Sequence, residues 1–157
     1  GPVKIQGITT GKIVDYGMED PMNMGACMAP AAAEVIYQHF VDFGSKPEDY
    51  DAVYTGDLGE VGKKILLHLL RENGYDLSKV HGDCGIEIYE NETQDTHSGG
   101  SGCACSAVVL ASMIIPKLID GTWKKVVPTG ALMSKTSFNE GENVAGIAHA
   151  IFLEGVR

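Results

Sequence analysis

The segment from Cys103 to Leu118 is apolar around almost its whole circumference when it is drawn as a helix. A helix that is apolar on every side must be buried on every side. One sheet with helices on its faces would leave the outer side in water, at a loss on the order of 10 kcal/mol, taking roughly 1.5 kcal/mol for each large side chain. We therefore expect a second layer over this helix, from another domain of the same protein or a second copy of the chain.

Strands and helices alternate along the rest of the chain, in the order β-β-α-β-α-β-α-β-β. This order predicts one α/β domain over residues 1–157, with a mixed five-stranded sheet and helices on both faces. Pro30 is expected in the first turn of its helix, and Pro116 is expected to bend or tighten a last turn. The predicted strands are Val3–Thr9, Lys12–Asp15, Asp51–Thr55, Gly85–Tyr89, Trp123–Pro128 and Gly146–Glu154, and the predicted helices are Pro30–Val41, Leu58–Arg71 and Cys103–Leu118.

Composition excludes several classes of function. The net charge of -9 leaves no basic stripe to neutralise phosphates, so a nucleic-acid partner is not expected. The longest apolar run, Ala107 to Ile115, is far shorter than the roughly 20 residues of a membrane-spanning helix. The four cysteines are expected to be free thiols in a reducing compartment. The Gly1-Pro2 start is typical of a protease scar, which predicts a longer natural protein.

Two stretches resemble thiolases. The loop from His97 to Gly102, followed by a helix predicted to be buried, resembles the thiolase loop that leads into a Gly-rich helix start. The ending from Gly146 to Glu154 resembles the last thiolase strand. The resemblance implies a fold of two similar halves in five layers, with a central pair of helices between two sheets.

The chain is more specifically similar to the C-terminal half of the stage V sporulation protein AD family. That family resemblance implies a non-enzymatic protein of spore formation that binds dipicolinic acid and assists its uptake into the developing spore. It also implies a link to spore germination and transport, other stage V membrane proteins as partners, and a peripheral place at the spore inner membrane. The matching stretches are Asp20–Gly25, Met28–Ala32, Thr55–Gly59, Gly121–Lys125, Thr129–Leu132 and Gly146–Ala150.

Two positions that thiolases use for catalysis hold unsuitable residues here. A condensing thiolase needs a nucleophilic cysteine and two further groups that move protons and polarise a carbonyl. Where relatives place a His or Asn, this chain has Tyr54 to Asp57, and where they place a second cysteine it has Glu142 to Val144. We therefore expect no catalytic residue and no enzyme activity. The alternatives are a condensing enzyme that uses coenzyme A and a structural subunit of a spore membrane complex.

The predicted ligand-binding residues surround the loop at His97. Free backbone N–H groups before the helix favour an anion, and the loop glycines let a ligand approach closely. His97 is equally consistent with a solvated loop histidine. Asp57 is expected as a helix N-cap, or else beside calcium carried with dipicolinate. The predicted set is His97, Ser98, Gly99, Gly100, Thr55, Asp57 and Asn143.

Two further residue patterns favour structural roles. His149 lies on a predicted core strand and is expected to be buried and hydrogen-bonded. Cys103-Ala104-Cys105 lacks the spacer that zinc ligands need, so no metal site is expected. The resemblance implies no cofactor apart from calcium bound to dipicolinate, and it implies contact with a missing N-terminal half or with a second copy.

Overall fold

A computed structural model of the chain describes residues 1–100, 102, 104–133 and 141–156. The described part contains one mixed five-stranded sheet in the order β1-β5-β4-β2-β3. β2 runs parallel to β3 and β4, whereas β5 runs antiparallel to β1 and β4. The strands are β1 (Val3–Thr10), β2 (Ala52–Thr55), β3 (His81–Asp83), β4 (Lys125–Met133) and β5 (Gly146–Gly155).

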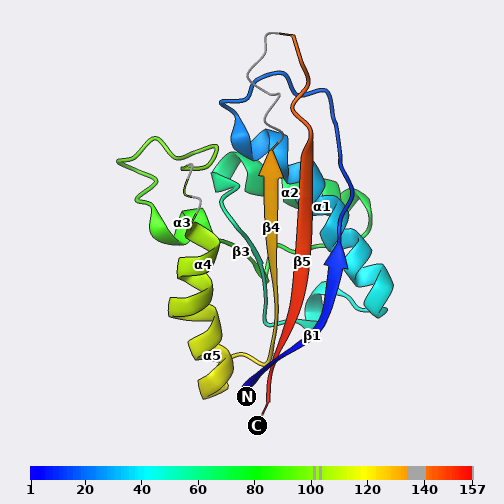
Figure 1. The fold of residues 1–157 in the computed structure, drawn as a ribbon, viewed down its shortest axis with the longest axis vertical. Helices are drawn as coiled ribbons and strands as arrows, with labels where there is room; N and C mark the ends of the chain where they lie inside the picture. Colours follow the sequence, from blue (N-terminus) through cyan, green and yellow to red (C-terminus); the bar gives the residue numbers. More distant parts are fainter. Residues whose placement is uncertain (101, 103, 134–140, 157) are drawn as a thin grey trace.

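Helices cover both faces of the sheet, as the sequence predicts. The two long helices lie against one face, and a run of three shorter segments stands against the other (Figure 1). The two ends of the chain lie close together at one end of the sheet (Figure 1). The helices are α1 (Met24–Phe43), the 3-10 turn η1 (Pro47–Asp49), α2 (Gly59–Glu72), α3 (Cys84–Ile88), α4 (Cys105–Val109), the π-helix η2 (Leu110–Ile114) and α5 (Ile115–Asp120).

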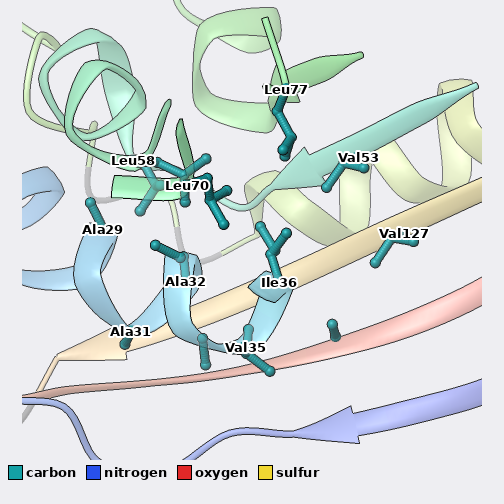
Figure 2. Packing of buried hydrophobic residues seen from close by; sticks show 14 of the residues in the cluster. Ala29, Ala31, Ala32, Val35, Ile36, Val53, Leu58, Leu70, Leu77 and Val127 are labelled. Atoms are coloured by element: carbon teal, nitrogen blue, oxygen red, sulfur yellow. The ribbon is translucent and has the colours of Figure 1, made fainter. Parts of the chain in front are cut away.

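The larger core lies between the sheet and the pair α1 and α2. Figure 2 shows Val35 and Ile36 of α1, together with Leu70 of α2, gathered against Val53 and Val127 of the sheet. All five side chains are fully buried. Alternate residues of β2 and β4 face this core, and the residues between them face α4 and α5, as the two-residue period of a strand requires.

Three sequence predictions of secondary structure are wrong. Lys12–Asp15 forms no strand, and Val14 makes only an isolated bridge to Gly146. Pro30 lies inside α1 rather than in its first turn, because the Asn23 side chain accepts the Ala26 N–H and starts the helix earlier. Gly85–Tyr89 is mostly the short helix α3, because the Asp83 carboxylate caps it.

The run α4–η2–α5 is buried on one side only in this chain. Cys105, Val109, Ile114 and Leu118 pack on the sheet, whereas Val108 is 49% and Ile119 51% exposed. The other side is left open in this chain, where the sequence predicts a second layer from another domain or a second copy.

Pro116 was expected to bend or tighten the last turn, and the run does not tighten before it but widens into a π-helix. Pro116 has no N–H to donate to the preceding turn, and the π-helix η2 lies directly before α5.

Candidate functional site

A cavity of about 800 Å³ opens between the run α4–η2 and the sheet, beside the carboxyl end of β2. Ligands commonly bind beyond the carboxyl ends of strands in open α/β sheets. The walls are mostly apolar, and three of the residues are methionines, whose flexible side chains fit varied ligand shapes. The cavity is lined by Met24, Met28, Tyr54, Thr55, Gly56, Asp57, Cys84, Gly102, Ser106, Ala107, Leu110, Ile114, Pro128, Thr129, Gly130, Ala131, Leu132, Met133, His149 and Ile151.

Asp83 holds together the loops that form one wall of this cavity. Its buried carboxylate accepts hydrogen bonds from the loop after β2 and from the first turn of α3. Burial raises the pKa of this carboxyl group, while the hydrogen bonds from Thr55 and the backbone oppose the rise. The donors are the Thr55 hydroxyl at 2.5 Å and the backbone N–H groups of Leu58, Gly59, Gly85 and Ile86.

Asp57 has a different role from the predicted N-cap. No side chain caps α2 at its N-cap residue Leu58, and Asp83 serves the first N–H groups of that helix instead. The Asp57 carboxylate accepts the Gly100 N–H at 3.0–3.1 Å and the Gly102 N–H at 3.0 Å. Two of the N–H groups that were predicted to receive a ligand anion are thus bonded to a carboxylate of the chain itself.

The loop at His97 contributes its backbone to the fold. The His97 carbonyl accepts the Val61 N–H at 2.8 Å, and the Ser98 carbonyl accepts the Gly25 N–H at 2.8 Å. The loop passes so close to α2 that a Cβ on Gly59 would lie 2.5 Å from the Gly99 nitrogen. The imidazole of His97 is exposed and is not among the residues that line the cavity.

The remaining predicted residues divide between the cavity and other places. Thr55 and Asp57 line the cavity, and Gly100 is tied to it through Asp57. Gly99 adopts φ +100°, which glycine tolerates best, and packs against the Asp57 carbonyl. Asn143 donates to Asp15 at 3.2 Å and does not line the cavity.

His149 was expected in the core, and this expectation is wrong. Its side chain is exposed on β5 and lines the cavity. The Gly11 N–H donates to His149 Nδ1 at 3.2 Å. Because strand residues alternate between faces, the prediction depended on both faces of β5 being covered, and the described residues cover only one of them here.

His81 and Thr129 each contain a buried polar atom without a partner among the described residues. The Thr55 hydroxyl donates to Asp83, so its oxygen accepts the His81 Nε2–H at 3.1 Å. His81 Nδ1 and Thr129 Oγ1 are left unpaired. Burial lowers the pKa of His81 to about 3, so this imidazole is neutral at physiological pH.

Sequence reasoning missed Asp83 and His81, which hydrogen-bond to the cavity residue Thr55, and His149, which lines the cavity. Only Asp83 had a visible signal, since an Asp directly before a short helix is a common N-cap. His81 and His149 act through contacts with distant segments.

Cys84 is the described cysteine that lines the cavity. Burial, with smaller contributions from Asp83 and other neighbours, raises the pKa of its thiol to about 12. The thiol is therefore protonated at neutral pH and is a poor nucleophile.

Residues 1–154 match the family model described as "Stage V sporulation protein AD (SpoVAD)". This chain belongs to the stage V sporulation protein AD family. The stage V sporulation protein AD of Bacillus subtilis (strain 168) is 46% identical over 156 residues, which are 98% of this chain and 46% of the relative. The chain thus spans about half the length of that family member.

The fold of the chain described here is thiolase-like. The solved structure of AbyA1, a tetronic acid condensing enzyme, aligns with a TM-score of 0.55 and 15% identity. The alignment covers 98% of this chain and 47% of AbyA1. The resemblance to the stage V sporulation protein AD family and to the thiolase fold, inferred from the sequence motifs, is confirmed.

Proposed function

We propose that this chain is part of a non-enzymatic binding protein of spore formation, whose cavity takes part in binding dipicolinic acid for uptake into the developing spore. The observation that carries the proposal is the cavity of about 800 Å³, with mostly apolar walls and a few polar groups. Small-molecule sites have this character and are typically about 300–1,000 Å³ in volume.

We propose that the protein is not an enzyme because the polar groups in this cavity are either already hydrogen-bonded or protonated. The Thr55 hydroxyl, within the stretch Tyr54 to Asp57 where thiolase relatives place a His or Asn, is bonded to Asp83 and His81. The Cys84 thiol is buried and protonated. Neither group is suited to activate a substrate carbonyl or to attack one.

The proposal includes partners outside this chain. The exposed apolar side of α4–η2–α5, around Val108 and Ile119, is a surface for the other half of a two-half thiolase-like protein or for a second copy. We further propose that the protein works beside other stage V membrane proteins at the spore inner membrane, in transport and germination. No helix of sufficient length and apolarity to span a membrane occurs among the described residues.

Calorimetric titration of dipicolinic acid, with and without calcium, tests the proposal in the full-length protein and in this chain alone. Saturable binding by the full-length protein is the expected result, and acetyl-coenzyme A is the control ligand. Turnover of acetyl-coenzyme A without dipicolinate binding would replace the proposal with a condensing enzyme. Binding of neither compound would leave a structural subunit.

Three variants sharpen the titration. Asp57→Asn tests whether a carboxylate in the cavity wall supports a calcium complex, and Asp42→Asn on the exposed side of α1 is its matched control. His97→Ala tests the predicted role of that histidine, which the cavity wall of this chain does not include. A calcium effect that survives Asp57→Asn would remove Asp57 from the proposal.

A further inference from the structure

Some of the polar side chains that line the cavity already form hydrogen bonds within the chain, and others do not. Thr55 donates to Asp83, and Asp57 accepts two backbone N–H groups. The lining contains no lysine or arginine among the described residues. His149 is therefore the one side chain of the described wall that can present a ring N–H or a positive charge to a ligand.

The contact with Gly11 decides which nitrogen of His149 faces a ligand. Gly11 N–H donates to Nδ1 at 3.2 Å, so the proton of the neutral ring is on Nε2. No described residue forms a hydrogen bond with Nε2. Gly11 approaches β5 so closely that a Cβ there would lie 2.1 Å from the Ala148 carbonyl oxygen, which requires glycine at this position. The fold thus fixes the orientation of the His149 imidazole and leaves its Nε2–H free to donate to a ligand.

The strand beside His149 leaves space for a ligand. Gly130 of β4 lies opposite His149 in the register, is exposed, and lines the cavity. A Cβ built on Gly130 would meet no atom within 4 Å. The Cα of Gly130 and the imidazole therefore border an open part of the cavity floor.

The apolar wall faces this floor from the helical side. Leu110 and Ile114 of the π-helix η2 line the cavity together with Ile151 of β5. Apolar walls on both sides suit a flat ring, and a single N–H donor suits an oxygen at its edge.

We infer that His149 binds the carboxylate of a planar aromatic acid through Nε2–H, with the ring of the acid lying over Gly130. This inference rests on the proposed function and deepens it, because it names the ligand-contacting side chain and extends the ligand class to planar aromatic carboxylates. A hydrogen bond to an ionised acceptor is roughly twice as strong as a neutral one, so the contact favours the acid over its uncharged analogue.

The test is a calorimetric titration of four compounds into the full-length protein: dipicolinate, isophthalate, benzoate and uncharged pyridine. His149→Ala is expected to weaken carboxylate binding about tenfold or more and to leave pyridine unaffected. Gly130→Val, which fills the open floor beside the imidazole, is expected to weaken carboxylate binding to a similar degree. His68→Ala is the matched control, because His68 is an exposed histidine on α2 beside Glu72 and away from the cavity.

The panel separates failure of this inference from failure of the proposed function. Unchanged affinity for every carboxylate in His149→Ala overturns the inference and leaves dipicolinate binding intact. Binding of benzoate or isophthalate that depends on His149, without any binding of dipicolinate, overturns the proposed function and supports the inference. If no carboxylate binds, both fail. His149→Gln, which keeps a side-chain N–H, replaces His149→Ala if circular dichroism shows that the alanine variant has lost its fold.

Discussion

The two faces of the sheet are covered to different degrees. On the face covered by α1 and α2, large side chains such as Phe40, Leu66 and Leu70 are fully buried. On the other face, the single helical run α4–η2–α5 leaves a cavity and exposed apolar groups. On the first face, the side chains of Thr9, His39, Tyr50 and Ser45 form a continuous chain of hydrogen bonds. The second contains polar groups, such as the His149 Nε2–H, that no described residue uses. The comparison indicates that the first face supplies stability and that the second is available for binding.

The chain of hydrogen bonds on the α1–α2 face begins at Thr9, whose hydroxyl donates to His39 Nδ1 at 3.1 Å. His39 Nε2–H then donates to the Tyr50 hydroxyl at 2.9 Å, and Tyr50 donates to Ser45. The rings of Phe43 and Phe152 pack against His39. Every polar atom of His39 is thus paired in an apolar setting, which makes this face sensitive to both truncation and protonation.

The largest expected effect compares the same substitution on the two faces. Ile36→Ala removes a side chain that is fully buried between α1 and the sheet, and we expect a loss of about 2–5 kcal/mol in the free energy of unfolding. Ile119→Ala, at a side chain that is 51% exposed on α5, is expected to cost about 0.5 kcal/mol or less. Urea unfolding of the two variants measures the difference, and equal losses would contradict the division of roles.

A smaller effect is expected from acid. Burial lowers the pKa of His39 to about 4, against about 6.5 in the unfolded chain. Below pH 6.5, His39 binds a proton in the unfolded chain but not in the folded chain, so stability falls as the pH falls from 6.5 towards 4. At pH 5 this histidine accounts for a loss of about 2 kcal/mol.

Unfolding of the wild type and of His39→Gln at pH 7 and pH 5 measures the contribution of His39. The wild type is expected to lose more stability than the variant between the two values. Since the lowered pKa of His81 acts in the same direction and the raised pKa of Asp83 in the opposite one, only the difference between the two proteins is diagnostic. An identical pH dependence would show that His39 is not held neutral by the fold.

The smallest effect on stability is expected on the open face. Val108→Lys places a charge on a side chain that is 49% exposed on α4, and the free energy of unfolding is expected to change by about 0.5 kcal/mol or less. Association of the chain with itself or with the other half is expected to weaken, as sedimentation velocity can measure. Unchanged association would place the contact elsewhere.

The sequence predicted the general layout of the helices well, because it depends on short-range patterns. The apolar period of residues 58–71 and the glycine at Gly44 predicted α2 and the end of α1, and Gly44 indeed adopts a left-handed conformation. The polar–apolar pattern did not reveal that Asp83 would start a helix where a strand was predicted, although its capping chemistry is local.

The candidate site followed from the sequence only in part. Thr55 and Asp57 were predicted to contact a ligand and both line the cavity, where Thr55 is the last residue of β2 and Asp57 follows in the next loop. The partners of Asp57 are 43 and 45 residues away, and Gly11 is 138 residues from His149. Contacts at such separations are created by the order of strands in the sheet, which no local pattern specifies.

The sequence by itself determined the family, the alternation of helices and strands, and the apolar character of the segment that becomes α4–η2–α5. The tertiary structure decided which of its sides is covered within this chain, that Asp57 bonds the loop N–H groups, and that His149 lines the cavity. The physical reason is that composition and periodicity set how apolar a surface is, whereas the packing of distant segments sets which surface meets water.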